Sequence, residues 1–421
     1  MVRAYMGGLT KKITRAYKIF DRHIKPATEV VIAYSGGKDS TVLSILFYRW
    51  LLRSRVPDVS VKLLHNDTSS EIDPMEVWAR EFMVAMQSRL QALGYETDVL
   101  ITRPSTVDTF YWRVIVRGYP APSFSFRWCV KLLKMLPTVR SLRAFLGSDG
   151  RKTLLLTGMR EDESIARART VKKRFGGCGL GPSKCTAYYL TTEDVTGITK
   201  LAPIRDWSNT DVWEFIRRVD DFQLSKLLYL YGCEEARYGC WHCTLVKVQW
   251  GLRALDKRYL YFDAVRLLYR LVSDIPSARL RKRTGYSRLG PLNAAARSLM
   301  LHLFTAAEEL SGLRLYGLDE ARISSGHTLR QLFYEMDEEE ATNLILREDK
   351  TIDPRRFYPI GLLRNLNPHD ELITRLHRKA ESYIVNGFNP ISEVLSQAVQ
   401  HRLRRTPPVE AKQGITSLKW L

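Results

Sequence analysis

The chain has 421 residues, of which 45% are hydrophobic, and it carries a formal net charge of +20. That length suggests two or three domains, and that composition excludes wholesale disorder. No apolar run reaches the roughly 18 residues that a membrane span needs, and the N-terminus lacks the apolar core of a signal peptide. We therefore expect a cytoplasmic protein with no membrane partner. The charge favours nucleic acid as a partner; a basic enzyme that acts on small phosphates is the alternative.

Strands and helices alternate along the first half of the chain. Residues 1–27 predict a basic amphipathic helix that leads into the first strand. Four apolar runs predict buried strands, and two stretches with apolar residues at helical spacing separate the first three. The strands are 29–34, 61–65, 96–101 and 153–157, and the helices are 41–53 and 73–93. This alternation predicts an α/β fold with a parallel sheet, whereas residues 110–122, which end in Gly-Tyr-Pro-Ala-Pro, predict a loop.

The pattern changes in the second half of the chain. Residues 169–192 are rich in glycine and predict a loop or a small subdomain. Ser208, with Asp211 three residues later, predicts the start of a helix. Residues 251–421 show mostly helical periodicity, with helices at 259–272, 293–310, 370–385 and 391–403. We expect three parts: an N-terminal helix (1–27), an α/β domain (28–250) and a separate helical domain (251–421).

A phosphate-binding segment stands where the first strand ends and the next helix begins. Its sequence is Ser35-Gly36-Gly37-Lys38-Asp39-Ser40. Glycines let the backbone approach a phosphate closely, and the helix N-terminus supplies N–H donors. Lys38 adds a full charge, and the hydroxyls of Ser35, Ser40 and Thr41 can donate hydrogen bonds, although the spacing is not that of a Walker A loop. Asp39 is unusual in an anion site, and one explanation is that it holds Mg²⁺, which in turn holds the phosphates.

This hexapeptide resembles the PP-loop of the adenine-nucleotide α-hydrolase superfamily. That superfamily includes enzymes that split ATP between the α- and β-phosphates, and the phosphoadenylyl-sulfate (PAPS) reductases. The resemblance implies a Rossmann-like parallel-sheet domain with an adenine nucleotide as its ligand, either ATP or PAPS or adenylyl sulfate. It also implies that residues 35–41 bind the phosphates and that Lys38 and Asp39 serve catalysis.

Three further segments resemble the PAPS reductase family, and the match covers about residues 28–250. They are Phe126-Arg127-Trp128-Cys129 with Lys131 and Lys134, Gly158-Met159-Arg160-Glu161-Asp162-Glu163-Ser164 with Arg167, and Pro203-Ile204-Arg205-Asp206-Trp207 with Asp211-Val212-Trp213. The resemblance implies that Arg127, Arg160 and Arg167 contact phosphate or sulfate, and that Arg160 is catalytic. We expect Asp67 and Thr68, at the end of a strand, to face the nucleotide.

Six cysteines favour a metal or redox site, because disulfides are the less common use of cysteine in a chain without a secretion signal. They are Cys129, Cys178, Cys185, Cys233, Cys240 and Cys243. Cys240 and Cys243 form a C-x-x-C pair, whose spacing suits an iron–sulfur cluster or zinc; free thiols are the alternative. Cys178 and Cys185 are candidates for a redox or persulfide-carrying pair, or for zinc ligands.

The resemblance narrows the metal to [4Fe–4S]. In the cluster-carrying branch of the family, a cysteine in the position of Cys129 joins the later C-x-x-C in binding the cluster. That branch has two adjacent cysteines there, whereas Val130 follows Cys129 in this chain. The implied ligands are therefore Cys129, Cys240 and Cys243, with either Cys233 or an open iron site as the fourth.

Longer sequence segments resemble those of the DndC-type sulfurtransferases of DNA phosphorothioation. They are Thr109-Phe110-Tyr111-Trp112, Arg117-Gly118-Tyr119-Pro120-Ala121-Pro122 and Arg237-Tyr238-Gly239-Cys240-Trp241-His242-Cys243-Thr244, together with Asp67, Thr68 and Glu71. The resemblance implies an enzyme that converts ATP to AMP and pyrophosphate and transfers sulfur to nucleic acid, DNA or tRNA. Its sulfur would come from a donor protein such as a cysteine desulfurase, and Cys178 and Cys185 would be its catalytic thiols.

Two other functions stay open. One is a reductase of PAPS or adenylyl sulfate to sulfite; reductases of the family use a cysteine near the C-terminus, and no cysteine follows Cys243 here. The other is a non-catalytic basic module that uses the nucleotide site to regulate a nucleic-acid complex.

Overall fold

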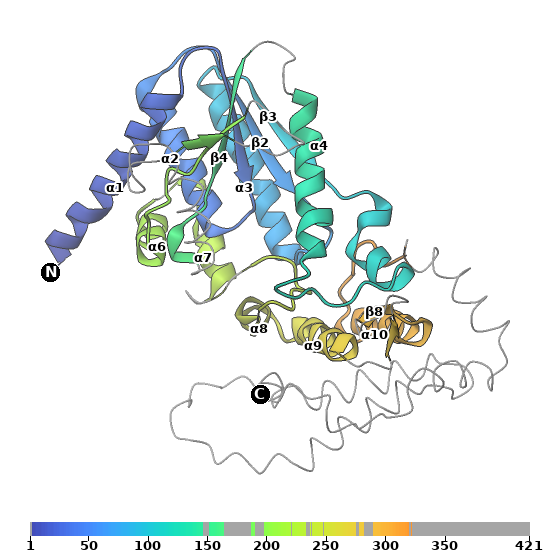
Figure 1. Cartoon of the computed structure of the whole chain (residues 1–421). Helices are drawn as coiled ribbons and strands as arrows, with labels where there is room; N and C mark the ends of the chain where they lie inside the picture. The colour runs from blue at the N-terminus through green and yellow to red at the C-terminus, as the bar shows by residue number, and fades with distance from the viewer. Residues whose placement is uncertain are drawn as a thin grey trace, which may run out of the picture. The chain divides into compact units, whose positions relative to one another are not determined.

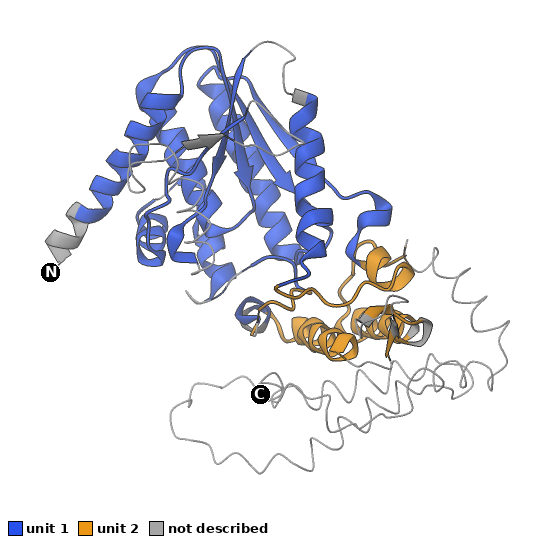
Figure 2. Ribbon diagram, viewed as in Figure 1, with its two compact units in different colours: residues 1–110, 125–241, 249–255 blue, residues 111–124, 242–248, 256–421 orange. Residues whose placement is uncertain are grey.

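The computed structural model forms two compact units (Figure 2). The first comprises residues 1–110, 125–241 and 249–255, and the second comprises residues 111–124, 242–248 and 256–421. The predicted boundary between residues 250 and 251 stays a prediction. No described helix is both long and apolar enough to cross a membrane. The described residues are 2–145, 151–163, 187–189, 198–219, 221–232, 236, 238–246, 248–274, 278–281, 289–319 and 321.

The first unit is built on a six-stranded sheet with the strand order β3-β2-β1-β4-β6-β5 (Figure 1). β1 pairs in parallel with β2 and β4, β2 pairs in parallel with β3, and β4 pairs in parallel with β6. The short β5 pairs antiparallel with β6. The predicted α/β fold with a parallel sheet is thus confirmed. The strands are β1 (Thr28–Tyr34), β2 (Val59–Asn66), β3 (Thr97–Thr102), β4 (Lys152–Thr157), β5 (Ala187–Tyr189) and β6 (Thr199–Leu201).

Helices cover the sheet, which explains why β1 and β2 are buried along nearly their whole length. α1 and α6 pack against α2, whereas α4 packs against β2 and β3. Leu142 of α4 packs in a buried cluster with Val31 of β1. Phe20 of α1 contacts Trp50 of α2, with their ring centroids 5.4 Å apart. The predicted N-terminal helix is confirmed as α1. These helices are α1 (Val2–His23), α2 (Lys38–Ser54), α3 (Asp73–Ala92), α4 (Leu136–Phe145), α6 (Asn209–Arg218), α7 (Ser225–Tyr231) and α8 (Trp250–Leu255).

The predicted start of a helix at Ser208 is confirmed as a capping box. Ser208 Oγ accepts a hydrogen bond from the backbone N–H of Asp211 at 3.1 Å, and the Asp211 carboxylate accepts one from the backbone N–H of Ser208 at 2.6 Å. Lys12 of α1 also pairs with Asp211. The same carboxylate therefore starts α6 and ties α1 to it, and replacing such an N-cap by alanine costs about 1 kcal/mol.

The second unit is mainly helical in its described part, with α9 (Leu260–Asp274) and α10 (Ala294–Ser311) where helices were predicted. Two features differ from prediction. Part of residues 110–122 is a π-helix (Trp112–Val116) rather than loop, and the strands β7 (Arg279–Arg281) and β8 (Leu289–Leu292) form an antiparallel pair. Leu292 N donates to Gly118 O at 2.6 Å. This long-range hydrogen bond joins the segment that contains the π-helix to β8, so the conformation of both depends on tertiary packing rather than on the local sequence pattern. The helices predicted at 370–385 and 391–403 lie outside the described residues.

Candidate functional site

The PP-loop turns sharply between β1 and α2, and Gly36 makes that turn possible. Its φ is +74°, a backbone conformation that disfavours residues with a side chain. A Cβ atom at Gly36 would also lie only 3.0 Å from the Cβ of Ala79 in α3. Trp78 of the same helix donates its indole N–H to Gly36 O at 3.1 Å. Helix α3 therefore fixes the loop from outside and leaves its other side open.

The serine hydroxyls of the loop hold its two ends together. Ser35 Oγ and Ser40 Oγ are 3.1 Å apart, and the backbone N–H of Ser35 donates to Ser40 Oγ at 3.2 Å. Ser40 and Thr41 also donate their hydroxyls to Gly37 O, each at 3.0 Å. These bonds preorganise the turn, so a phosphate would find its backbone donors already placed.

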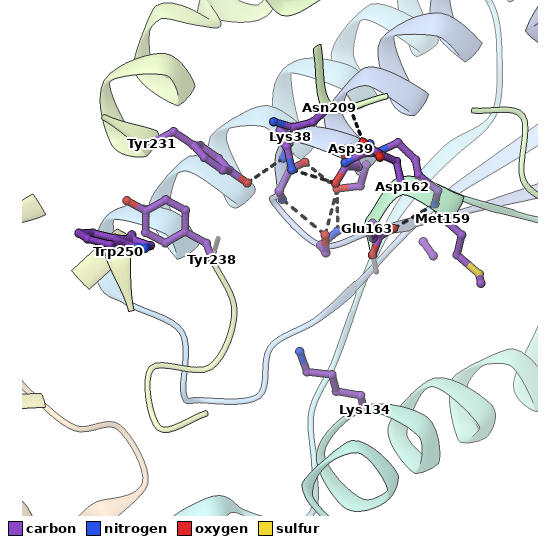
Figure 3. A pocket seen from close by; sticks show the side chains of 16 residues that line it. Lys38, Asp39, Lys134, Met159, Asp162, Glu163, Asn209, Tyr231, Tyr238 and Trp250 are labelled. Carbon is purple, nitrogen blue, oxygen red and sulfur yellow. Dashed lines mark hydrogen bonds and ion pairs between the residues drawn. The ribbon is translucent and has the colours of Figure 1, made fainter. Parts of the chain in front are cut away.

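A cavity of about 710 Å³ opens over the PP-loop (Figure 3). Because α2 begins at Lys38, the N–H groups of its first turn have no intrahelical acceptor and carry the positive end of the helix dipole. The cavity is lined by Ala33, Ser35, Gly37, Lys38, Asp39, Ser40, Lys134, Gly158, Met159, Arg160, Asp162, Glu163, Asn209, Tyr231, Tyr238 and Trp250.

Gly158, just after β4, brings the segment that follows this strand against the first turn of α2. A Cβ atom at Gly158 would lie 2.9 Å from the carbonyl carbon of Asp39 and 3.0 Å from the backbone nitrogen of Ser40. Real Cβ atoms do not approach backbone so closely, so only glycine permits this contact. It places Arg160, two residues further on, beside Asp39.

Asp39 carries an ion pair on each of its carboxylate oxygens. Arg160 Nε donates to Oδ1 at 2.8 Å, and Lys38 Nζ lies 3.2 Å from Oδ2. To bind Mg²⁺ directly, Asp39 would have to exchange one of these pairs for the metal. Mg²⁺ bound to nucleotide needs only one or two carboxylates in addition to phosphate and water, so the site can supply what that ion requires. The Mg²⁺ role of Asp39 stays a prediction.

Arg160 is buried, with 2% of its surface exposed. Besides Asp39, it donates through Nη1 to Trp207 O at 3.1 Å, and its backbone N–H donates to Glu163 Oε1 at 3.0 Å. It therefore lines the cavity as predicted, but its Nε is committed to Asp39. Its expected contact with phosphate or sulfate stays a prediction. Arg167, which was predicted to share that role, lies outside the described residues.

Asp67 and Thr68 follow β2 but do not line this cavity. Asp67 Oδ2 accepts from Arg103 Nε at 2.8 Å and from Arg80 at 3.0 Å. Thr68 donates its hydroxyl to Glu71 at 2.8 Å. Arg127 is an exposed residue that also lies outside the cavity lining. That all three contact the nucleotide stays a prediction, and the described contacts give Asp67 and Thr68 a structural role in shaping the loop after β2.

The predicted metal ligands are only partly described. Cys129, Cys240 and Cys243 are half-buried and form no disulfide within the described residues, and Cys233, Cys178 and Cys185 lie outside the described residues. Cys240 Sγ is 3.5 Å from Thr68 Oγ1, and Trp241 N donates to Ser70 O at 2.9 Å. Within the described ranges, no three His, Cys, Asp or Glu side chains are grouped as metal ligands. The donors suit a cluster in kind, but the described part of the chain does not assemble them into a site.

Three aromatic residues form one side of the cavity, and the sequence did not reveal two of them as site residues. The ring centroids of Tyr231 and Tyr238 lie 4.9 Å apart in an edge-to-face contact, and Trp250 is 50% exposed at the cavity. A Cβ atom at Gly251 would lie 2.7 Å from the Tyr238 ring, so glycine lets α8 pack against it. Tyr238 belongs to a segment that the sequence analysis singled out, whereas Tyr231 and Trp250 lie outside every motif recognised there.

The profile of the phosphoadenosine phosphosulfate reductase domain matches residues 29–246, just over half of the 421-residue chain. The chain belongs to this family. An uncharacterized protein of Methanocaldococcus jannaschii is 23% identical over 213 residues, which are 50% of this chain and 40% of that protein. Sulfate adenylyltransferase subunit 2 of Streptomyces lavendulae is 27% identical over 256 residues, which are 58% of this chain and 69% of that protein. The match thus spans less than half the length of the first relative.

Solved structures that are similar to this chain include nucleotide-using enzymes. FMN adenylyltransferase of Candida glabrata has a TM-score of 0.31 at 13% identity, covering 54% of this chain and 60% of its own. The U34-tRNA thiolase NcsA of Methanococcus maripaludis, solved with its [4Fe–4S] cluster, has a TM-score of 0.31 at 11% identity, covering 60% of this chain and 71% of its own. Likeness at this level does not transfer a function to this chain.

Proposed function

We propose that this PP-loop protein is an ATP-dependent sulfurtransferase that acts on nucleic acid and forms AMP and pyrophosphate. The observation that carries the proposal is the phosphate cradle, by which we mean the preorganised glycine turn at the start of α2 together with Lys38 and the Asp39–Arg160 pair. Lys38, Asp39 and Arg160 all line one cavity. Backbone donors and a helix dipole stabilise a phosphate group that gains negative charge as it leaves. The geometry therefore suits release of pyrophosphate from the α-phosphorus of ATP.

The first step would be adenylylation of the acceptor. An oxygen of the nucleic acid attacks the α-phosphorus, a new O–P bond forms, and the bond to the β-phosphate breaks. Pyrophosphate leaves with the electron pair of that bond and stays on residues 35–41. AMP on the acceptor oxygen is then a good leaving group for the next step.

The second step would deliver sulfur. A persulfide, R–S–S⁻, loaded by a donor such as a cysteine desulfurase, displaces AMP and forms a bond between its terminal sulfur and the acceptor. A second thiolate of the protein attacks the inner sulfur, which leaves the thiolated nucleic acid and a protein disulfide. An external dithiol then reduces that disulfide. Cys178 and Cys185 are the proposed pair for this exchange, and both lie outside the described residues.

Nucleic acid is the proposed acceptor because of the net positive charge of the chain and an exposed aromatic ring at the cavity. The chain carries 65 Lys and Arg residues against 45 Asp and Glu residues, and such a surplus attracts polyanions. Trp250 presents a half-exposed ring at the edge of the cavity, and aromatic faces stack unpaired bases without regard to sequence. A [4Fe–4S] cluster on Cys129, Cys233, Cys240 and Cys243 remains part of the proposal, and neither step above passes through it.

A reductase of PAPS or adenylyl sulfate is the second candidate, because the matched family is described by that reaction. The two candidates differ in what happens to sulfur. A reductase releases sulfite from a sulfated nucleotide, whereas a sulfurtransferase places sulfur on another molecule. Both use the same cradle, so only the products distinguish them.

Transfer of radioactive sulfur tests the proposal. The protein, purified without oxygen, is incubated with ³⁵S-cysteine, a cysteine desulfurase, ATP and either DNA or tRNA, and the label in the nucleic acid is counted. We expect ATP-dependent labelling that the Lys38→Ala variant loses and the Lys226→Ala variant keeps, because among the described residues Lys226 pairs with Glu81 alone, in an exposed contact. Sulfite release from PAPS, with no label in either nucleic acid, would favour the reductase.

A further inference from the structure

Tyr231, the last residue of α7, reaches into the PP-loop through its hydroxyl. The backbone N–H of Lys38 donates to Tyr231 Oη at 3.1 Å, and a Cβ atom built on Gly37 would lie 3.5 Å from the same oxygen. Figure 3 shows the Tyr231 hydroxyl directed at Lys38. The hydroxyl thus stands among the donors that would surround a phosphate, although no pattern in the sequence links residue 231 to the loop.

The hydroxyl is buried, and it accepts a hydrogen bond without a visible acceptor for its own proton. Tyr231 is 4% exposed. A phenol can accept and donate at once, and among the described residues its only hydrogen-bond partner is the Lys38 N–H, which it accepts. A buried donor without an acceptor costs free energy. Burial raises the pKa of Tyr231, so the proton remains on the oxygen throughout the physiological range.

The ring that carries this hydroxyl is fixed by its neighbours. Trp213 and Tyr238 each contact it edge-to-face, with ring centroids 4.9 Å away in both cases. Lys38 Nζ lies 5.9 Å from the centre of the same ring. The oxygen therefore has little freedom to turn away, and a donor fixed in advance loses little entropy when a ligand arrives.

We propose that Tyr231 is a phosphate-binding residue of the PP-loop: its hydroxyl accepts the Lys38 N–H and donates its own proton to a phosphoryl oxygen seated on the loop. The anion would then accept hydrogen bonds both from the N–H groups at the start of α2 and from a side chain of α7. The inference rests on the proposed function only for the identity of that anion, which is the pyrophosphate half of ATP.

Binding measured without catalysis tests the role of the hydroxyl. The affinities of inorganic pyrophosphate and of AMP are determined by calorimetry on the full chain and on Tyr231→Phe, which keeps the ring contacts. Tyr34→Phe is the matched control, because Tyr34 is also buried, lies next to the loop, and places its hydroxyl 3.4 Å from Thr41 Oγ1 without lining the cavity.

We expect Tyr231→Phe to weaken pyrophosphate binding about tenfold, the loss of one hydrogen bond to a charged group, and to change AMP binding less than about twofold. Tyr34→Phe should change neither affinity by more than about twofold. Unchanged pyrophosphate binding in Tyr231→Phe would overturn the proposal, as would an equal loss for both ligands accompanied by a lower melting temperature. Failure of sulfur transfer would refute the proposed function and leave these binding results intact.

Discussion

Arg160 Nε lies 2.8 Å from Asp39 Oδ1, although 121 positions separate the two residues in the chain. The contact joins the end of β4 to the first turn of α2, the two elements that meet at Gly158. Lys38 pairs with the other carboxylate oxygen, so Asp39 is the centre of a three-residue charge network inside the phosphate cradle.

Asp39→Asn should raise the Mg²⁺ concentration needed for half-maximal ATP binding by about tenfold. The amide keeps the shape of the side chain but gives up the negative charge, so it competes poorly for the metal. The change should also destabilise the fold by about 1–3 kcal/mol, because the buried Arg160 guanidinium loses its counter-charge. Calorimetric ATP titrations at several Mg²⁺ concentrations measure the first effect, and thermal unfolding measures the second.

Asp206→Asn is the control for that experiment, because Asp206 makes an exposed pair with Arg15 at 2.8 Å and does not line the cavity. It should leave the Mg²⁺ dependence unchanged. If Asp39→Asn needs the same Mg²⁺ concentration as the unmodified protein, Asp39 does not bind the metal and serves only in its ion pairs with Arg160 and Lys38.

Gly158→Ala should destabilise the protein by about 1–3 kcal/mol and weaken ATP binding. The added methyl would lie 2.9 Å from the carbonyl carbon of Asp39, and relief of that clash pushes β4 away from α2. Gly8→Ala serves as the control, since Gly8 lies in α1 with nothing within 4 Å of an added Cβ. It should stabilise the protein slightly, by up to about 1 kcal/mol. Chemical denaturation measures the free energy of unfolding of both variants. Equal changes in this free energy would contradict the close approach at Gly158.

Trp250→Ala should weaken the binding of a single-stranded oligonucleotide about tenfold, because a stacking surface for one base is lost. Fluorescence anisotropy with a labelled single strand measures the change. Tyr229→Ala is the matched control: Tyr229 is also an exposed aromatic residue, at 80% exposure, but it does not line the cavity. If both variants bind the strand like the unmodified protein, the nucleic acid does not reach the cavity along this edge.

Asp211 should make the fold sensitive to acid. Burial tends to raise its pKa, but the hydrogen bonds from Lys12 and Ser208 and the charge of Lys12 lower it overall. A carboxyl group with a pKa below that of the unfolded chain stabilises the fold above about pH 4, and that contribution disappears as the pH falls through the folded-state pKa. In Asp211→Asn, unfolding free energy should therefore depend less steeply on pH below about 4. An identical slope would show that the Lys12–Asp211 pair does not contribute.

The sequence predicted what depends on local signals. The glycine turn after β1 and the capping box at Ser208 each require only a few neighbouring residues, and both appear as predicted. The Arg160–Asp39 pair could not be predicted as a contact, since it depends on how β4 lies beside β1. Tyr231 and Trp250 were missed because they stand in no motif, and only the fold brings them to the cavity. The β7–β8 pair was missed because its strands are short and flanked by helical sequence.

The products formed from ATP distinguish the proposed sulfurtransferase from the alternatives. The protein is purified without oxygen and incubated with α-labelled ATP, with and without DNA or tRNA, and AMP, ADP, pyrophosphate and phosphate are separated and quantified. We expect AMP and pyrophosphate in equal amounts, formed faster when the acceptor nucleic acid is present and not formed by Lys38→Ala. ADP and phosphate as products, or no turnover of ATP together with sulfite release from PAPS, would contradict it.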